Sequence, residues 1–180
     1  MINTFLKLTT TPFLVSLAVS ALITPLVIFV YRQLNLVEDP KKHKTFKTTH
    51  TTPVPRGGGI PIFLSILTAS ILFLPIDKHL LGILIGALII TITGVLDDKN
   101  DLSPYLRLGL GFLAAGFVVA SGVGIGFITN PFNGIIALDN LRISFELFGK
   151  PRSILVLADI FALFWIVGLS NITNWAKGFD

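Results

Sequence analysis

Charge is scarce in this chain. Charged residues make up 13% of its 180 residues and hydrophobic residues 52%, whereas a soluble domain carries about 25% charged residues. The few charges are also clustered, so that long uncharged stretches lie between them. This distribution argues against an ordinary water-soluble domain, and we expect lipid to be the solvent for much of the chain.

Cysteine is absent, which excludes disulfides, thiolate metal sites and thiol nucleophiles but indicates no compartment. A cleaved signal peptide is not expected, because Lys7 is the only early charge and no small-residue cleavage site follows the first apolar run. The net charge is +4. We expect no nucleic-acid partner, because the basic residues lie in short loops between apolar runs.

Five apolar segments approach the length of a membrane-spanning helix, which takes roughly 20 residues with about 17–25 tolerated. We therefore predict an all-α integral membrane protein, with one polytopic domain over residues 1–180 and a bundle of about five transmembrane helices. Pro25 is expected to kink the first helix. The predicted spans are 13–31, 58–75, 80–96, 106–128 and 154–170.

The basic residues are divided unevenly between the two faces of this bundle. One face carries nine Lys and Arg residues, in loops 32–57 and 97–105, at Arg107 and in the C-terminal stretch, and the other carries five. Cytoplasmic loops are rich in Lys and Arg. We therefore expect the first face to lie on the cytoplasmic side of the plasma (inner) membrane.

Residues 135–147 do not have a helical pattern. Apolar and polar residues alternate from Ile143 to Leu147, and Asp139-Asn140 indicates a turn between two apolar runs. We predict a small extracytoplasmic β-hairpin here, on the face opposite the basic loops.

The first of three polar clusters lies in the long basic loop. Lysines, His50 and Arg56 precede the glycines 57–59, which open the second apolar segment. Glycines let backbone N–H groups approach an anion, and a helix N-terminus favours negative charge. The cluster is a candidate phosphate-binding loop. The alternative is a basic cytoplasmic loop whose glycines only break the chain.

The second cluster contains Asp97 and Asp98, directly after the third apolar segment. Two adjacent carboxylates beside lipid repel each other and resist desolvation, so they favour a bound cation. Oxygen ligands that share phosphate oxygens suit Mg²⁺. The alternative is a solvated helix end, where acidic residues are common. In either case Ser103-Pro104 is expected to start the next helix, with Ser103 as the N-cap.

The third cluster contains Asn171 and Asn174, which fall on one helical face at the end of the fifth segment. Buried amides require hydrogen-bond partners, which a ligand or the neighbouring helices of a bundle could supply. The predicted topology sends all three clusters to one face. This convergence suits a reaction between a phosphorylated soluble substrate and a phosphorylated lipid. A transporter would instead hold polar residues near the middle of several spans, and a non-catalytic membrane remnant is the third alternative.

These motifs resemble those of the polyprenyl-phosphate N-acetylhexosamine-1-phosphate transferases. Residues 50–59 (HTTPVPRGGG) resemble the first cytoplasmic motif, His-x-x-Pro-x-Pro-Arg-x-Gly-Gly. Residues 94–107 (GVLDDKNDLSPYLR) are similar to Gly-x-x-Asp-Asp…Leu-Ser-Pro, and residues 171–180 (NITNWAKGFD) to the start of Asn-x-x-Asn-x-x-Asp-Gly-x-Asp-Gly. The chain departs at Lys177, where many members carry an acid.

The resemblance implies transfer of a HexNAc-1-phosphate from a UDP-N-acetylhexosamine to a polyprenyl (undecaprenyl) phosphate, with release of UMP. Such steps begin cell-envelope glycans, including peptidoglycan and lipopolysaccharide. The implied cofactor is Mg²⁺, with Mn²⁺ as the alternative ion. The resemblance also implies that these residues are the N-terminal part of a longer transferase, and it leaves a homodimer open.

Roles for individual residues follow from the matching positions. The resemblance makes Asp98 a metal ligand, and Asp97 either the base that prepares the lipid phosphate or the nucleophile itself. The remaining candidates are substrate or metal ligands: Asp180 for the metal, Asn171 and Asn174 for nucleotide or metal, and Lys47, His50 and Arg56 for phosphates.

Overall fold

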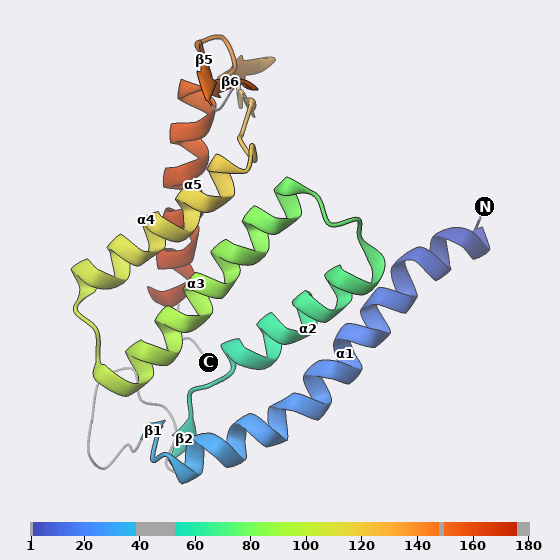
Figure 1. The fold of residues 1–180 in the computed structure, drawn as a ribbon, viewed down its shortest axis with the longest axis vertical. Coiled ribbons are helices and arrows are strands. Elements are labelled where there is room, and N and C mark those ends of the chain that lie inside the picture. Colours follow the sequence, from blue (N-terminus) through green and yellow to red (C-terminus); the bar gives the residue numbers. More distant parts are fainter. Residues whose placement is uncertain (1, 39–52, 148–149, 176–180) are drawn as a thin grey trace.

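The structure is a computed structural model that describes residues 2–38, 53–147 and 150–175. Helices dominate these parts of the chain, and six short strands lie between them (Figure 1). The helices are α1 (Ile2–Gln33), α2 (Gly59–Phe73), α3 (Lys78–Asn100), α4 (Pro104–Ala120) and α5 (Val156–Trp175). The prediction of a mostly helical chain is therefore confirmed.

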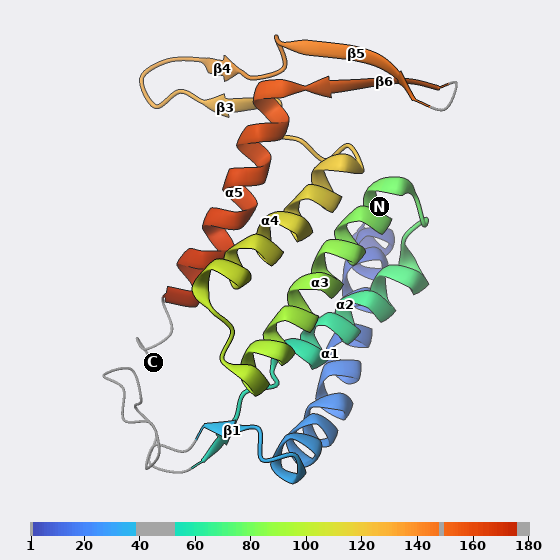
Figure 2. The ribbon, with the colours of Figure 1, turned by 60° about the vertical axis from the view of Figure 1, so that its left-hand side comes forward.

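Consecutive helices run in opposite directions along the bundle. α1 lies beside α2, α3 beside α4, and α4 beside α5 (Figure 2). As a result α1, α3 and α5 all end at the same end of the molecule, where α2 and α4 begin. We call this the motif end, because the described parts of all three polar clusters are located there.

The connection between α3 and α4 follows from local sequence. α3 ends at Asn100, and the next residue, Asp101, has a left-handed φ of 45°, a conformation that aspartate tolerates better than most residues. Ser103 then caps α4, its hydroxyl accepting a hydrogen bond from the Leu106 N–H at 3.3 Å, with Pro104 at the first helical position. The predicted helix start at Ser103-Pro104 is confirmed.

The fourth predicted segment, 106–128, is too long. α4 ends at Ala120, and Gly122 has a φ of +97°, which an L side chain rarely adopts. Gly124 and Gly126 follow and weaken helix formation further. Residues Phe127–Thr129 form strand β3 instead.

Two hairpins replace the single hairpin that we predicted around Asp139-Asn140. β3 pairs with β4 (Ile135–Ala137), and β5 (Arg142–Leu147) pairs with β6 (Lys150–Leu155). Residues 130–134 form the first turn, because Gly134 takes a φ of +71° and the Asn130 side chain accepts a hydrogen bond from the Phe132 N–H. Asp139-Asn140 therefore lies in the link between the hairpins.

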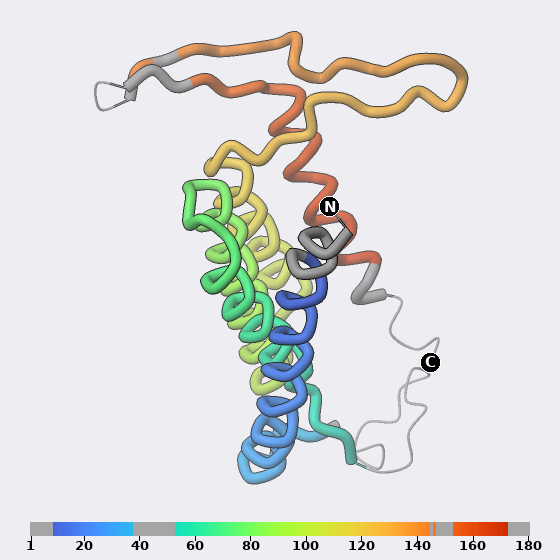
Figure 3. The backbone as a smooth tube through the Cα atoms, turned by 90° about the vertical axis from the view of Figure 1, so that its right-hand side faces the viewer, coloured from blue at the N-terminus to red at the C-terminus, as the bar shows by residue number. Residues whose placement is uncertain are grey.

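Both hairpins extend across the end of the bundle opposite the motif end (Figure 3). β6 runs directly into α5, so the fifth helix begins at Val156, later than the predicted residue 154. At the motif end, the short strands β1 (Val37–Glu38) and β2 (Val54–Pro55) pair with each other.

Small residues let the central helices approach closely. A Cβ atom added at Gly86 would lie 2.8 Å from the Val118 Cγ2 atom and 3.0 Å from the Ala114 carbonyl oxygen. Ala114 and Ala115 on α4 are buried. Close packing of small residues is typical of helices that associate within a membrane.

The outer surfaces of the helices are strongly apolar. Large side chains such as Leu22 on α1 and Ile62 on α2 are 77% and 59% exposed. Among the described residues, two helical segments, 9–33 and α3, are long and apolar enough to cross a membrane. α2, α4 and α5 contain shorter apolar stretches. A soluble monomer rarely leaves such extensive apolar surface in water.

Candidate functional site

A pocket of about 320 Å³ lies at the motif end of the bundle. Its lining joins segments far apart in sequence, from the end of α1, the start of α2, the α3–α4 region and the end of α5. Residues from all three polar clusters contribute to it, namely Arg56, Gly57, Asp97, Asp98, Arg107 and Asn171. The expected convergence of the clusters is therefore seen in the structure.

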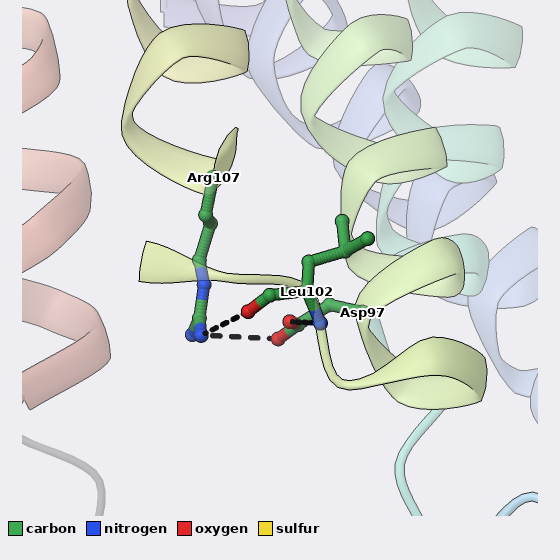
Figure 4. Close-up of polar contacts among 3 residues, drawn as sticks. All are labelled: Asp97, Leu102 and Arg107. Atoms are coloured by element: carbon green, nitrogen blue, oxygen red, sulfur yellow. Dashed lines mark hydrogen bonds and ion pairs between the residues drawn. The ribbon is translucent and has the colours of Figure 1, made fainter. Parts of the chain in front are cut away.

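Asp97 is anchored to the beginning of α4 (Figure 4). Its Oδ1 atom accepts a hydrogen bond from the Leu102 N–H at 3.1 Å, and its Oδ2 atom lies 3.4 Å from the Arg107 Nη1 atom. Arg107 also donates through Nη2 to the Leu102 carbonyl oxygen at 3.4 Å. The Asp97 carboxylate thus fixes the turn between α3 and α4 and holds the Arg107 guanidinium beside the pocket.

Asp98 is held from a different direction. Its Oδ2 atom accepts a hydrogen bond from the Tyr31 hydroxyl at 3.5 Å. Tyr31 is at the end of α1 and is only 3% exposed. The two adjacent carboxylates therefore contact different helices, Asp97 contacting α4 and Asp98 contacting α1.

The glycines 57–59 do not share one role. A Cβ atom added at Gly57 would lie 2.6 Å from two ring atoms of Tyr31, whereas Gly58 and Gly59 have open space on that side. Gly57 and Gly59 line the pocket, and α2 begins at Gly59. The start of a helix therefore faces the same space as the carboxylates.

The third cluster reaches the pocket through Asn171, whose Nδ2 atom donates to the Val167 carbonyl oxygen within α5 at 2.8 Å. Asn174 lies in the last turn of α5, and its side chain is outside the described part of the structure. Lys47, His50 and Asp180 are also outside the described residues.

Arg107 and Tyr31 line the pocket, but neither was assigned a role from the sequence. Arg107 belongs to the second motif, and only a short helix connection separates it from Asp97, so the sequence allows a contact between them. Tyr31 gives no comparable signal, because it ends an apolar run 67 positions before Asp98. Its contact with Asp98 depends on how α1 and α3 lie in the folded bundle.

The donor atoms at the pocket suit a hard cation. Mg²⁺ is commonly held by one or two carboxylates, together with waters and substrate phosphates. Asp97 and Asp98 supply such carboxylates, and among residues 2–38, 53–147 and 150–175 there is no cluster of three His, Cys, Asp or Glu residues. The two carboxylates therefore fit the donor chemistry of a Mg²⁺ ion that also takes waters and substrate phosphates.

Sequence comparison agrees with the motifs. Residues 80–180, which include the second and third motifs, match the sequence model of glycosyl transferase family 4. The chain belongs to glycosyl transferase family 4.

Three relatives carry more specific names. A probable undecaprenyl-phosphate N-acetylglucosaminyl 1-phosphate transferase of Bacillus subtilis is 31% identical over 170 residues, covering 93% of this chain and 42% of the relative. A phospho-N-acetylmuramoyl-pentapeptide-transferase of Streptococcus uberis is 31% identical, covering 93% and 50%. A decaprenyl-phosphate N-acetylglucosaminephosphotransferase of Mycobacterium leprae is 26% identical, covering 87% and 37%.

The chain thus spans half or less of the length of these relatives. No solved structure matches it significantly.

Proposed function

We propose that this chain forms part of a transferase that moves a HexNAc-1-phosphate from a UDP-sugar to a polyprenyl phosphate, releasing UMP. The observation that carries this proposal is the pocket at the motif end, where basic, carboxylate and amide residues from distant segments meet beside apolar helices. A soluble nucleotide sugar and a membrane-held lipid phosphate can both reach such a place.

The relatives support the same reaction. Their names describe transfer of a phosphorylated amino sugar, and two of them name a polyprenyl phosphate. The amino sugar differs among them, so the sugar used by this chain is a separate question. A transporter is less well supported, because the charged residues of the pocket lie near the ends of the helices.

The proposal places this bundle in the plasma membrane as five spans. α1 and α3 are long enough for a hydrocarbon layer of about 30 Å, and the three shorter helices are apolar. The motif end carries most of the basic residues, so we place it on the cytoplasmic side and the two hairpins outside. A homodimer would bury part of the exposed apolar surface.

The residues of the pocket suggest a division of labour. Arg56, with Lys47 and His50 from the same motif, would bind phosphates of the nucleotide sugar, and Asn171 and Asn174 would bind nucleotide or metal. Asp98 and Asp180 would hold Mg²⁺, which would offset negative charge on the pyrophosphate when bound. These assignments use only polar groups of the three motifs.

Asp97 would accept the proton of the lipid phosphate. A phosphate oxygen then attacks the sugar-bearing phosphorus, the bond to UMP breaks, and UMP leaves with the bonding electrons. Arg107 lies beside Asp97, and its Nε atom is buried without a hydrogen-bond partner among the described residues. A buried donor without an acceptor is costly, and a substrate phosphate oxygen would satisfy it.

Asp98→Asn tests the proposal, with Asp101→Asn as a matched control. Asp101 is an exposed acid in the same connection, and asparagine tolerates its left-handed conformation. In the intact protein, we expect Asp98→Asn to weaken the Mg²⁺ dependence and to lower UMP release by about 10²-fold or more, with Asp101→Asn staying within a few-fold. Equal activity of both variants would contradict the proposed function.

A further inference from the structure

Tyr31 has surroundings unlike those of the other tyrosine in the chain. It is 3% exposed at the end of α1, whereas Tyr105 at the start of α4 is 87% exposed. A tyrosine hydroxyl needs a hydrogen-bond partner when it is buried. The partner here is the Oδ2 atom of Asp98, at 3.5 Å.

The ring of Tyr31 fills a space that is open only because residue 57 is glycine. A Cβ atom at that position would lie 2.6 Å from the Cε2 and Cζ atoms of the ring and 2.8 Å from the Cγ1 atom of Val27. The other two glycines of the motif have no neighbour within 4 Å of an added Cβ. The first motif therefore contacts the second through this ring.

We propose that Tyr31 is a positioning residue that orients the Asp98 carboxylate for metal binding, with Gly57 providing the space for its ring. The inference rests on the proposed function, since it concerns the metal ligand of that reaction. A contact of 3.5 Å is long, but the hydrogen bonds of catalytic groups often tighten only when a ligand is present. Partners of metal-binding carboxylates commonly control metal affinity in this way.

The arrangement also gives the two adjacent carboxylates different contacts. Arg107 holds Asp97 from α4, and Tyr31 contacts Asp98 from α1. A cation neutralises the charge that it contacts, whereas a neutral hydroxyl orients a carboxylate without neutralising it. The Tyr31 hydroxyl itself therefore adds no positive charge beside Asp98.

Tyr31→Phe removes the hydroxyl and keeps the ring, and Tyr105→Phe makes the same change at the exposed tyrosine. Binding of Mn²⁺ to the intact protein without substrate would be measured by electron paramagnetic resonance. We expect Tyr31→Phe to weaken Mn²⁺ binding about 10-fold and to leave the thermal unfolding midpoint near that of the parent protein. Tyr105→Phe should change neither quantity.

A double-mutant cycle separates orientation of Asp98 from a general structural effect. In an Asp98→Asn background, Tyr31→Phe should cause little further loss of Mn²⁺ affinity, because the two residues act through one contact. Gly57→Ala should also weaken Mn²⁺ binding, since its Cβ displaces the ring, and this loss should not add to that of Tyr31→Phe.

The outcomes distinguish this inference from the proposed function. Unchanged Mn²⁺ affinity in Tyr31→Phe, with a clear loss in Asp98→Asn, would overturn the role of Tyr31 alone. Additive losses in the cycle would also overturn it. Unchanged affinity and UMP release in Asp98→Asn would instead contradict the proposed metal site itself.

Discussion

Replacing Asp97 with asparagine separates a chemical role from a structural one, because the structure shows what the residue does apart from catalysis. The amide oxygen of the new side chain could still accept the hydrogen bond from the Leu102 N–H. The change would remove the ion pair with Arg107, whose Nη1 atom lies 3.4 Å from the carboxylate. The side chain of Arg107 is 36% exposed and that of Asp97 is 27% exposed. Partly exposed ion pairs contribute about 0.2–1 kcal/mol.

A general base contributes far more to the rate. Its loss typically lowers turnover about 10²–10⁴-fold, which corresponds to about 2.7–5.5 kcal/mol of activation free energy. We therefore expect Asp97→Asn in the intact protein to lose at least about 10²-fold in turnover while its stability falls by no more than about 1 kcal/mol. The expected increase in activation free energy is therefore larger than the expected loss in stability.

The assay is release of UMP from a UDP-N-acetylhexosamine with polyprenyl phosphate, across a Mg²⁺ titration, beside thermal unfolding in detergent. Arg107→Met removes the same ion pair together with the hydrogen bond to the Leu102 carbonyl oxygen, so it should cost at least as much stability. If Asp97→Asn retains turnover within a few-fold of the parent protein, the carboxylate is only the anchor of the α3–α4 turn. The reasoning about its basic role would then be refuted.

Three further predictions address topology, the hairpins and packing. Single cysteines at Thr48 and Asn140 should label from opposite sides of intact cells, and labelling from one side would refute the predicted orientation. Replacing residues 145–152 with an Asn-Gly turn should leave turnover within a few-fold, because β5 and β6 lie at the end away from the pocket; loss of activity at normal expression would contradict this. Gly86→Ala should lower stability by about 1–3 kcal/mol through overpacking, whereas Gly116→Ala, with no neighbour within 4 Å, should be neutral or stabilising in thermal unfolding.

Some of these features could be predicted from the sequence because they depend on local patterns. The helix start at Ser103-Pro104 needs only a cap and a proline. The motif residues reached one end because successive spans cross in opposite directions, which places alternate connections on the same side. The pairing of the strands was harder to predict from the sequence. The run at 135–137 pairs backward with β3, because Gly134 provides a turn before it, and alternation alone does not identify the partner of a strand.

The contact between Tyr31 and Asp98 could not be predicted for a different reason. It depends on how α1 approaches α3 and on the missing side chain at Gly57. From the sequence, we interpreted the glycines of that motif as part of an anion-binding loop, because glycine lets the backbone approach a ligand closely. The structure shows that at least one of the three glycines also accommodates an aromatic ring.

The pocket also has a consequence for the order in which the protein is made. Tyr31, Gly57 and the two aspartates leave the ribosome before Asn171, which follows Asp98 by about 70 residues, on the order of 4–14 seconds at typical synthesis rates. During that interval the carboxylates lack their α5 wall. Arg107 is translated almost immediately after Asp97, so their ion pair can form while the nascent chain is still being inserted. The residue that holds Asp97 in the finished pocket would thus also neutralise one of two adjacent charges during biogenesis.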